Sequence, residues 1–149
     1  MTTNNNKAVL PTLWIPGGRG MLGSLLATRA AAAGMHVLAT GRDVDAADRD
    51  VVDAFVALHR PALIVNCAAW TAVDLAETER DAAHRANAVL PAVVGVAAAR
   101  IGARALHVST DYVFDGRAPS PERPLREDDP TGPASVYSAT KREGELAFL

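Results

Sequence analysis

The sequence is poor in the features that mark secreted, membrane-spanning and nucleic-acid-binding proteins. Its single cysteine, Cys67, excludes an intrachain disulfide. Residues 1–7 are polar and lack the apolar centre of a signal peptide, and we expect them to be disordered. No uninterrupted apolar run approaches the ~18 residues that span a membrane. The formal net charge of −2 favours neither nucleic acid nor an anionic membrane as a partner. We therefore expect a cytoplasmic protein without either partner, and we assign no metal site.

Short apolar runs alternate with longer segments of helical periodicity along the 149 residues. Strands are predicted at 10–15, 36–40, 63–68 and 105–110, with room for a further short strand around Val44, and helices at 22–33, 48–60, 79–100 and 136–148. We expect Pro91 to break or kink the third helix. The proline-rich segment 115–133 is predicted to be an extended surface loop. This rhythm predicts an α/β fold, a Rossmann-type doubly wound parallel sheet, as one domain over residues 1–149.

A glycine-rich loop joins the first predicted strand to the first predicted helix. Gly17, Gly20 and Gly23 read G-x-x-G-x-x-G, and Gly18 with the last two reads G-x-G-x-x-G. Glycines there permit a tight turn and let the backbone approach a pyrophosphate, while the helix offers its N-terminal amides to the anion. The context between strand and helix favours dinucleotide binding over a plain strand–helix turn. The cofactor-binding residues assigned from this loop and helix are Gly17, Gly20, Met21 and Leu22.

The residues after the second predicted strand bear on the choice between NAD and NADP. An acidic residue at this position binds the adenosine ribose and favours NAD, whereas an arginine accepts the 2′-phosphate of NADP. Arg42 follows this strand and Arg19 lies in the glycine loop, so we expect NADP, although Asp43 leaves NAD open. Surface charge is the alternative interpretation for both arginines. Asp45 or Asp48 could lie near the adenine, with a helix cap as the alternative for Asp48.

Small residues end the strand predicted at 63–68. Asn66 and Cys67 are followed by Ala68 and Ala69, whose short side chains leave room for a cofactor. We assign Ala68 and Ala69 to the cofactor site. A strand end with an ordinary polar turn is the alternative interpretation.

The segment STDYVFDG (109–116) follows the last predicted strand. In open α/β sheets, ligands bind outside the carboxyl ends of the strands. Ser109, Thr110 and Tyr112 each offer a hydroxyl there that could reach a substrate oxygen. A polar turn after a strand is the alternative interpretation for Thr110 by itself.

Tyr137 and Lys141 are four residues apart on a predicted helix and therefore share one face. A phenol with a pKa of ~10 is a poor acid at neutral pH unless its anion is stabilised, which a nearby ammonium group achieves. The spacing Tyr-x-x-x-Lys is common by chance. Behind a glycine-rich loop and a hydroxyl-bearing strand end, it indicates a catalytic pair.

Together these motifs resemble the dTDP-4-dehydrorhamnose reductase family, a branch of the extended short-chain dehydrogenase/reductases. The likeness runs from about residue 13 to residue 145. The segment STDYVFDG matches the family motif as it stands and is its most specific element. The glycine fingerprint matches as well, and Asn87 matches an asparagine on the family's following helix.

Two longer segments extend the resemblance. Residues 66–77, NCAAWTAVDLAE, look like the family's N-A-A-A-x-T-A-V-D-x-A-E. Residues 127–145 carry the acidic-proline lead-in, the Tyr–Lys pair and the Gly-Glu that follows it. The sequence departs from the family pattern at Pro16, at Leu75 in place of the usual Lys, and at Ser138 in place of a common Gly. None of these departures removes a proposed catalytic group.

The resemblance implies a reaction. NADPH would deliver hydride to the C4 ketone of a dTDP-4-keto-6-deoxy-hexose, a nucleotide-sugar of dTDP-L-rhamnose biosynthesis. Thr110, Tyr137 and Lys141 are the implied catalytic residues: Tyr137 donates the proton, Lys141 lowers the Tyr137 pKa and holds the nicotinamide ribose, and Thr110 hydrogen-bonds the same oxygen. Tyr137 and Lys141 are therefore also assigned to cofactor binding. The resemblance leaves room for a homodimer.

Chains of this family continue past the length seen here, with further strands and a C-terminal substrate region. We therefore expect either a fragment of a longer protein or a trimmed cofactor domain, and we expect the last strand to form a sheet edge. A non-catalytic dinucleotide-binding or regulatory subunit stays open as an alternative function. A related sugar-nucleotide epimerase or dehydratase is a third, which the segments STDYVFDG and TAVDLAE disfavour.

Overall fold

Four parallel strands form the centre of the protein in the computed structural model, which describes residues 11–116 and 123–148. The expected disorder of residues 1–7 and part of the predicted loop 115–133 lie outside the described residues. The strands are β1 (Thr12–Pro16), β2 (His36–Thr40), β3 (Leu63–Asn66) and β4 (Arg104–His107), in the order β2-β1-β3-β4. The strand order reverses direction at β1, which confirms the predicted Rossmann-type fold.

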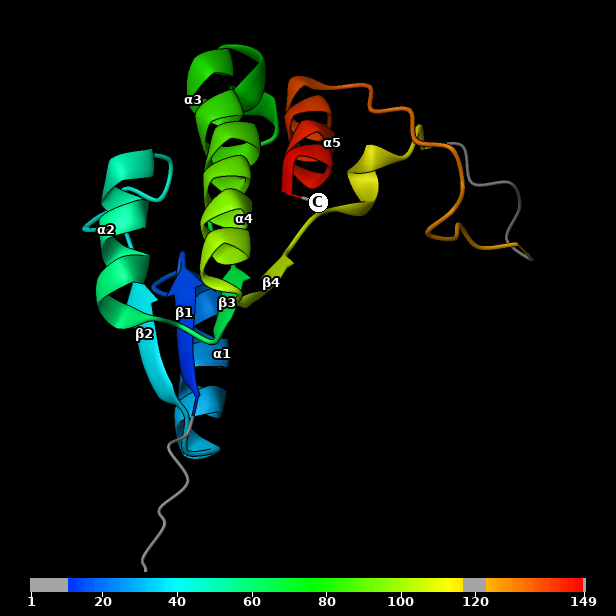
Figure 1. The fold of residues 1–149 in the computed structure, drawn as a ribbon. Coiled ribbons are helices and arrows are strands. Elements are labelled where there is room, and N and C mark those ends of the chain that lie inside the picture. The colour runs from blue at the N-terminus through cyan, green and yellow to red at the C-terminus, as the bar shows by residue number, and fades with distance from the viewer. Residues whose placement is uncertain (1–10, 117–122, 149) are drawn as a thin grey trace, which may run out of the picture.

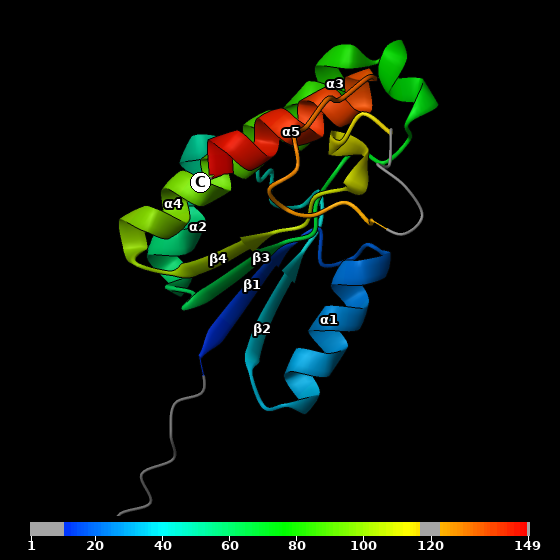
Figure 2. The ribbon, with the colours of Figure 1, turned by 90° about the vertical axis from the view of Figure 1, so that its right-hand side faces the viewer.

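Helices cover both faces of this sheet. Helix α1 (Met21–Ala32) lies on one face, and α2 (Arg49–His59), α4 (Leu90–Ile101) and α5 (Val136–Phe148) lie on the other (Figures 1 and 2). Alternate residues of β1 point to opposite faces. Trp14 packs with Val52, Val56 and Val94 of the α2 and α4 layer. Leu13 and Ile15 pack toward the α1 side.

The loop 41–48 contains turns and no strand, so the expectation of a short strand around Val44 was wrong. Two carboxylates explain the difference, because each accepts a backbone N–H within the loop. Asp43 accepts from Gly41 at 2.8 Å, and Asp45 accepts from Ala47 at 3.1 Å. Such local bonds compete with the ladder of a strand. Asp48 then caps α2, as its alternative interpretation predicted, by accepting from the amides of residues 50 and 51.

The helical stretch before β4 runs without interruption through three segments, α3 (Arg80–His84), the π-helical turn η2 (Arg85–Val89) and α4. Pro91 stands second in α4, has no N–H to donate and would crowd the carbonyl of Asn87. The wider π turn accommodates it, so the predicted kink takes the form of a π-bulge. Gly144 of α5 packs at this bulge, where an added Cβ would lie 2.0 Å from the Asn87 carbonyl oxygen.

By length and composition alone, the stretch Arg80–Ile101 could cross a membrane. The sequence has no uninterrupted apolar run of that length, but the Asp, Glu, Lys and Arg residues of this helix are confined to positions 80–85 and 100. Its residues Val94, Ala97 and Ala98 are buried in the core that contains Trp14. Core packing therefore accounts for the apolar composition of this helix.

Strand β4 forms one edge of the described sheet, as predicted. It is the fourth strand rather than the fifth, because the loop around Val44 adds none. Residues 104–106 are exposed, with Leu106 at 52%. Within the described part of the chain, this edge strand is therefore poorly covered.

Candidate functional site

The glycine-rich loop lies against the ends of β2 and β3. Gly17 has a φ of +75°, and an added Cβ would lie 2.5 Å from the Ala68 amide nitrogen. A Cβ at Gly23 would lie 2.3 Å from the Gly17 carbonyl oxygen. Gly18 donates its amide to Thr40 at 2.8 Å and so ties the loop to β2. The loop therefore requires glycine for backbone conformation and for close approach.

A cavity of about 540 Å³ opens in front of this loop. Six of the ten residues assigned to cofactor binding from sequence line it: Gly17, Gly20, Arg42, Asp45, Ala68 and Ala69. A second cavity of about 320 Å³ is lined by Met21, Leu22, Tyr137 and Lys141, and it shares Gly20, Cys67 and Ala69 with the first. The structure thus brings all ten assigned residues to two adjoining cavities at the carboxyl ends of the strands.

Charged side chains line the first cavity or contact Gly41 in its wall. Arg19 pairs with Asp43 at 3.0 Å, and backbone hydrogen bonding, chiefly from Gly41, lowers the pKa of the Asp43 carboxyl. Asp45 is paired as well, because Arg85 donates to both of its carboxylate oxygens at 2.7 and 3.3 Å. Sequence reasoning did not find Arg85, since no local pattern links residues 40 positions apart. Arg42 is exposed and lines the same cavity.

Lys141 is the largest charged side chain buried in the second cavity, with 1% of its surface exposed. Its Nζ donates to the Val108 carbonyl at 2.7 Å and lies 3.4 Å from Nε2 of His107. Burial lowers the pKa of Lys141, and Glu145 partly opposes that effect. The Tyr137 ring lies one helical turn earlier and meets the Tyr112 ring edge-on, with centroids 6.0 Å apart.

In sequence, Thr110 lies between residues that line two different cavities, and Thr110 itself lines neither of them. Ser109 lines the cavity of Lys141, and its buried Oγ has no hydrogen-bond partner among the described residues. Tyr112 lines a further cavity of about 530 Å³, together with Ser138. Thr110 itself caps the short helix η3 (Asp111–Val113) by accepting from the Tyr112 amide at 3.2 Å. The segment 109–112 thus forms the local turn that Thr110 caps and also contributes Ser109 to the cavity of Lys141.

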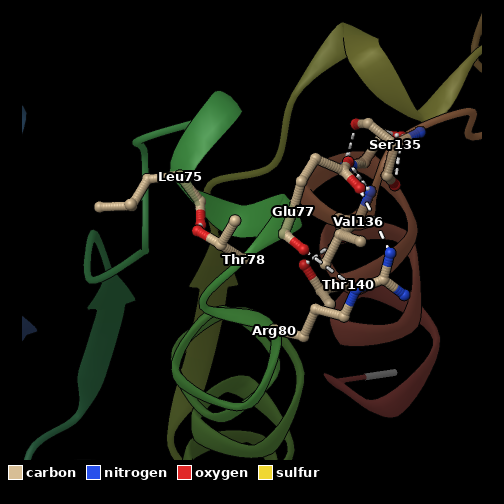
Figure 3. Close-up of polar contacts among 8 residues, drawn as sticks. Leu75, Glu77, Thr78, Arg80, Ser135, Val136 and Thr140 are labelled. Atoms are coloured by element: carbon tan, nitrogen blue, oxygen red, sulfur yellow. Dashed lines mark hydrogen bonds and ion pairs between the residues drawn. The ribbon is translucent and has the colours of Figure 1, made fainter.

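The N-terminus of α5, which carries Tyr137, is capped twice. Ser135 and Ser138 cap it reciprocally, each hydroxyl accepting from the other residue's amide at 3.1 and 2.9 Å. Glu77, at the end of the short helix η1 (Asp74–Glu77), accepts from the Val136 amide at 2.8 Å (Figure 3). The departure at Ser138 thus has a structural role. The departure at Leu75 changes a side chain that is 49% exposed.

Asn87 connects the loop after β3 to the same helix. Its side chain is fully buried, accepts from the Trp70 amide at 2.8 Å and donates to the Thr140 hydroxyl at 3.3 Å. The loop, the π-bulge and α5 are therefore held in one arrangement. Among residues 11–116 and 123–148, no three His, Cys, Asp or Glu side chains gather as a metal site.

The sheet order, the glycine loop and the cavities at the strand ends define a Rossmann-type α/β domain. Residues 11–149 match the family model described as RmlD substrate binding domain. The chain belongs to the dTDP-4-dehydrorhamnose reductase family. It is 48% identical over 140 residues to "dTDP-4-dehydrorhamnose reductase" of Streptomyces griseus, an alignment that covers 93% of this chain and 45% of the relative.

Two further relatives frame the comparison. A "probable dTDP-4,6-dihydroxy-2-methyloxan-3-one 4-ketoreductase" of Streptomyces antibioticus is 45% identical over 137 residues, covering 91% of this chain and 45% of the relative. The crystal structure of the dTDP-4-dehydrorhamnose reductase of Bacillus anthracis in complex with NADP superimposes with a TM-score of 0.88 at 34% identity, covering 95% of this chain and 50% of that one. The chain thus spans about half the length of the relatives it matches.

Proposed function

We propose that this domain binds NADPH, with NADH as a weaker alternative, and that the whole protein to which it corresponds reduces the C4 ketone of a dTDP-4-keto-6-deoxy-hexose. The observation that carries the proposal is the convergence of the glycine loop, Tyr137 and Lys141 on two adjoining cavities. The relatives of Streptomyces griseus and Streptomyces antibioticus are both named for a dTDP-linked substrate, and the second is named a 4-ketoreductase. A cytoplasmic location without nucleic-acid or membrane partners belongs to the same proposal.

The cavity fits a dinucleotide. At Gly17 the backbone approaches Ala68 so closely that a Cβ has no space, and the first turn of α1 has no side-chain cap and no acidic residue. Its amides are therefore available to a pyrophosphate. Bound NADPH would supply the hydride for the reaction. The Asp43 carboxylate already accepts from Arg19 and Gly41, which leaves it less free to bind the ribose hydroxyls of NAD. Arg42 and Arg19 therefore favour the 2′-phosphate of NADPH.

The chain's own residues would manage the proton. Tyr137 donates its phenolic proton to the oxygen that develops negative charge on the sugar. Lys141 stabilises the resulting phenolate and holds the ribose. Thr110 donates a hydrogen bond to the same sugar oxygen, a smaller electrostatic contribution.

Calorimetric titration with NADPH and NADH tests the cofactor part. We expect tighter NADPH binding, and Arg42→Gln should remove a charge-assisted contact that contributes about 1.5–3 kcal/mol where it is desolvated. Arg29→Gln, at the far end of α1, is the matched control and should leave both affinities unchanged. Equal affinity for the two cofactors in the unmodified protein would contradict the proposal.

Turnover distinguishes the enzyme from a non-catalytic dinucleotide-binding subunit. We expect the mass-verified 149-residue chain to bind NADPH without robust reduction of a dTDP-4-keto-6-deoxy sugar, and a chain extended to the length of the relatives to reduce it. Steady-state turnover by the 149-residue chain alone would refute the first expectation. Cofactor binding without reduction by the extended chain would favour the non-catalytic alternative.

A further inference from the structure

A chain of hydrogen bonds runs from the backbone after β3 to the Lys141 amine. The Ala68 amide donates to Oδ1 of Asn66 at 3.0 Å, and Nδ2 of Asn66 lies 3.0 Å from Nδ1 of His107. On its other side, Nε2 of His107 lies 3.4 Å from Nζ of Lys141. The side chains of Asn66 and Lys141 are fully buried, so their polar groups need partners within the protein.

The first bond determines the others. A backbone N–H can only donate, so the atom of Asn66 that faces Ala68 is the carbonyl oxygen, and the amide cannot flip without placing two donors together. The Asn66 NH₂ group then faces His107 and donates to Nδ1. An imidazole that accepts at Nδ1 and is neutral carries its proton on Nε2. His107 therefore presents an N–H donor to Lys141.

The two protonation states of Lys141 respond differently to this donor. A charged ammonium group has three donors and no acceptor, so it meets the Nε2–H donor to donor. A neutral amine has one lone pair, which can accept from Nε2–H while an amine hydrogen still donates to the Val108 carbonyl at 2.7 Å. Only the neutral amine satisfies every group in the chain of bonds.

We propose that Asn66 fixes His107 in its Nε2–H form and that His107 thereby acts as a positioning residue that favours release of the Lys141 proton. The surrounding charges are consistent with this assignment. Burial, and then Lys141, lower the pKa of His107 to about 4, so the imidazole is neutral at pH 7. Burial lowers the pKa of Lys141, whereas the Glu145 carboxylate raises it. Arg142 pairs with Glu145 at 2.7 Å and offsets part of that carboxylate's charge. Tyr137 and Cys67 are the other ionisable groups lining this cavity.

The consequence for the reaction rests on the proposed function. When Tyr137 gives its phenolic proton to the sugar oxygen, a proton from Nζ of Lys141 moves to the phenolate oxygen. The lone pair left on Nζ accepts the Nε2–H bond of His107, and a proton from solvent then restores the ammonium group. No other bond is made or broken at these residues. His107 thus lowers the cost of the neutral amine without exchanging a proton itself.

Nuclear magnetic resonance can read both ends of this chain of bonds in the protein without cofactor. The imidazole nitrogens of ¹⁵N-labelled histidine distinguish the Nε2–H from the Nδ1–H form, and the chain has four histidines. The pKa of His107 is lowered to about 4, so its imidazole should stay neutral at pH 5. We expect Nε2–H at His107, and an Nδ1–H form there would overturn the proposal without any variant. The sequence has only two lysines, Lys7 and Lys141, so ¹³Cε signals resolve the Lys141 titration directly.

Two substitutions and a control complete the test. Asn66→Asp can accept from both Ala68 and Nδ1–H, so it should reverse the His107 form and raise the Lys141 midpoint. His107→Gln can turn its carbonyl oxygen to the ammonium group, and the midpoint should rise by about one pH unit, the equivalent of one hydrogen bond. His36→Gln, at the exposed first position of β2, should leave the midpoint unchanged.

A folded His107→Gln protein with an unchanged Lys141 midpoint would refute the proposal. Because these signals are measured without NADPH or sugar, this failure is distinct from a failure of the proposed reaction, which the titration and turnover experiments report.

Discussion

Replacing Gly17 with alanine should both destabilise the protein and abolish cofactor binding. Gly102→Ala is the control that separates backbone strain from steric overlap. Both glycines have positive φ, +75° at Gly17 and +70° at Gly102. A left-handed conformation costs a residue with a Cβ roughly 1–2 kcal/mol. At Gly102 nothing lies within 4 Å of an added Cβ, so Gly102→Ala should lose only that amount.

At Gly17 the same strain is joined by overlap, because the Cβ would lie 2.5–2.7 Å from backbone atoms of residues 67 and 68. Backbone atoms cannot rotate away, and forcing atoms into a packed site costs typically about 1–3 kcal/mol. Gly17→Ala should therefore lose about 2–5 kcal/mol in total. The difference between the two variants measures how closely the glycine loop approaches the end of β3.

Urea denaturation of the two variants tests this reasoning, with the slope of the transition checked for two-state behaviour. NADPH titration follows under conditions where each variant is folded. We expect Gly102→Ala to bind NADPH as the unmodified protein does and Gly17→Ala not to bind it. If the two variants lost the same stability and kept the same affinity, the close approach of Gly17 to Ala68 would be refuted.

Three further outcomes follow from the site. In a chain of full length, Tyr137→Phe and Lys141→Met should each reduce kcat by about 10²–10⁴-fold, and Thr110→Val should reduce it less; near-normal kcat for Tyr137→Phe would exclude it as the proton donor. Glu77→Ala removes a cap of α5 and should cost about 1 kcal/mol of stability in urea denaturation, whereas Glu77→Gln keeps an acceptor and should cost less; equal losses would contradict the capping role. Because the folded-state pKa of His107 is lowered from 6.5 to about 4, the unfolded chain binds the proton first, so stability should fall as pH decreases from 6.5 to 4, and His107→Gln should reduce that slope.

Much of the site was readable from sequence because its signals are local. The glycine loop follows a strand and opens a helix, and its glycines are required by the backbone of that same turn. Tyr137 and Lys141 share a helix face by spacing alone. Parallel strands bring their carboxyl ends to one edge, so the order of elements was enough to gather these motifs there.

The tertiary structure alone decided the partners that join distant segments. Arg85 reaches Asp45 across 40 residues, and Glu77 caps a helix 59 residues further along. The strand predicted around Val44 was wrong because the carboxylates of Asp43 and Asp45 accept backbone N–H groups of the loop, which favours turns over a strand. The sequence does not reveal the geometry of these hydrogen bonds. The form of His107 was equally hidden, since it depends on which atom of Asn66 faces Ala68. A side chain's hydrogen-bond role follows from its neighbours in space, and the sheet order sets those neighbours only after the chain has folded.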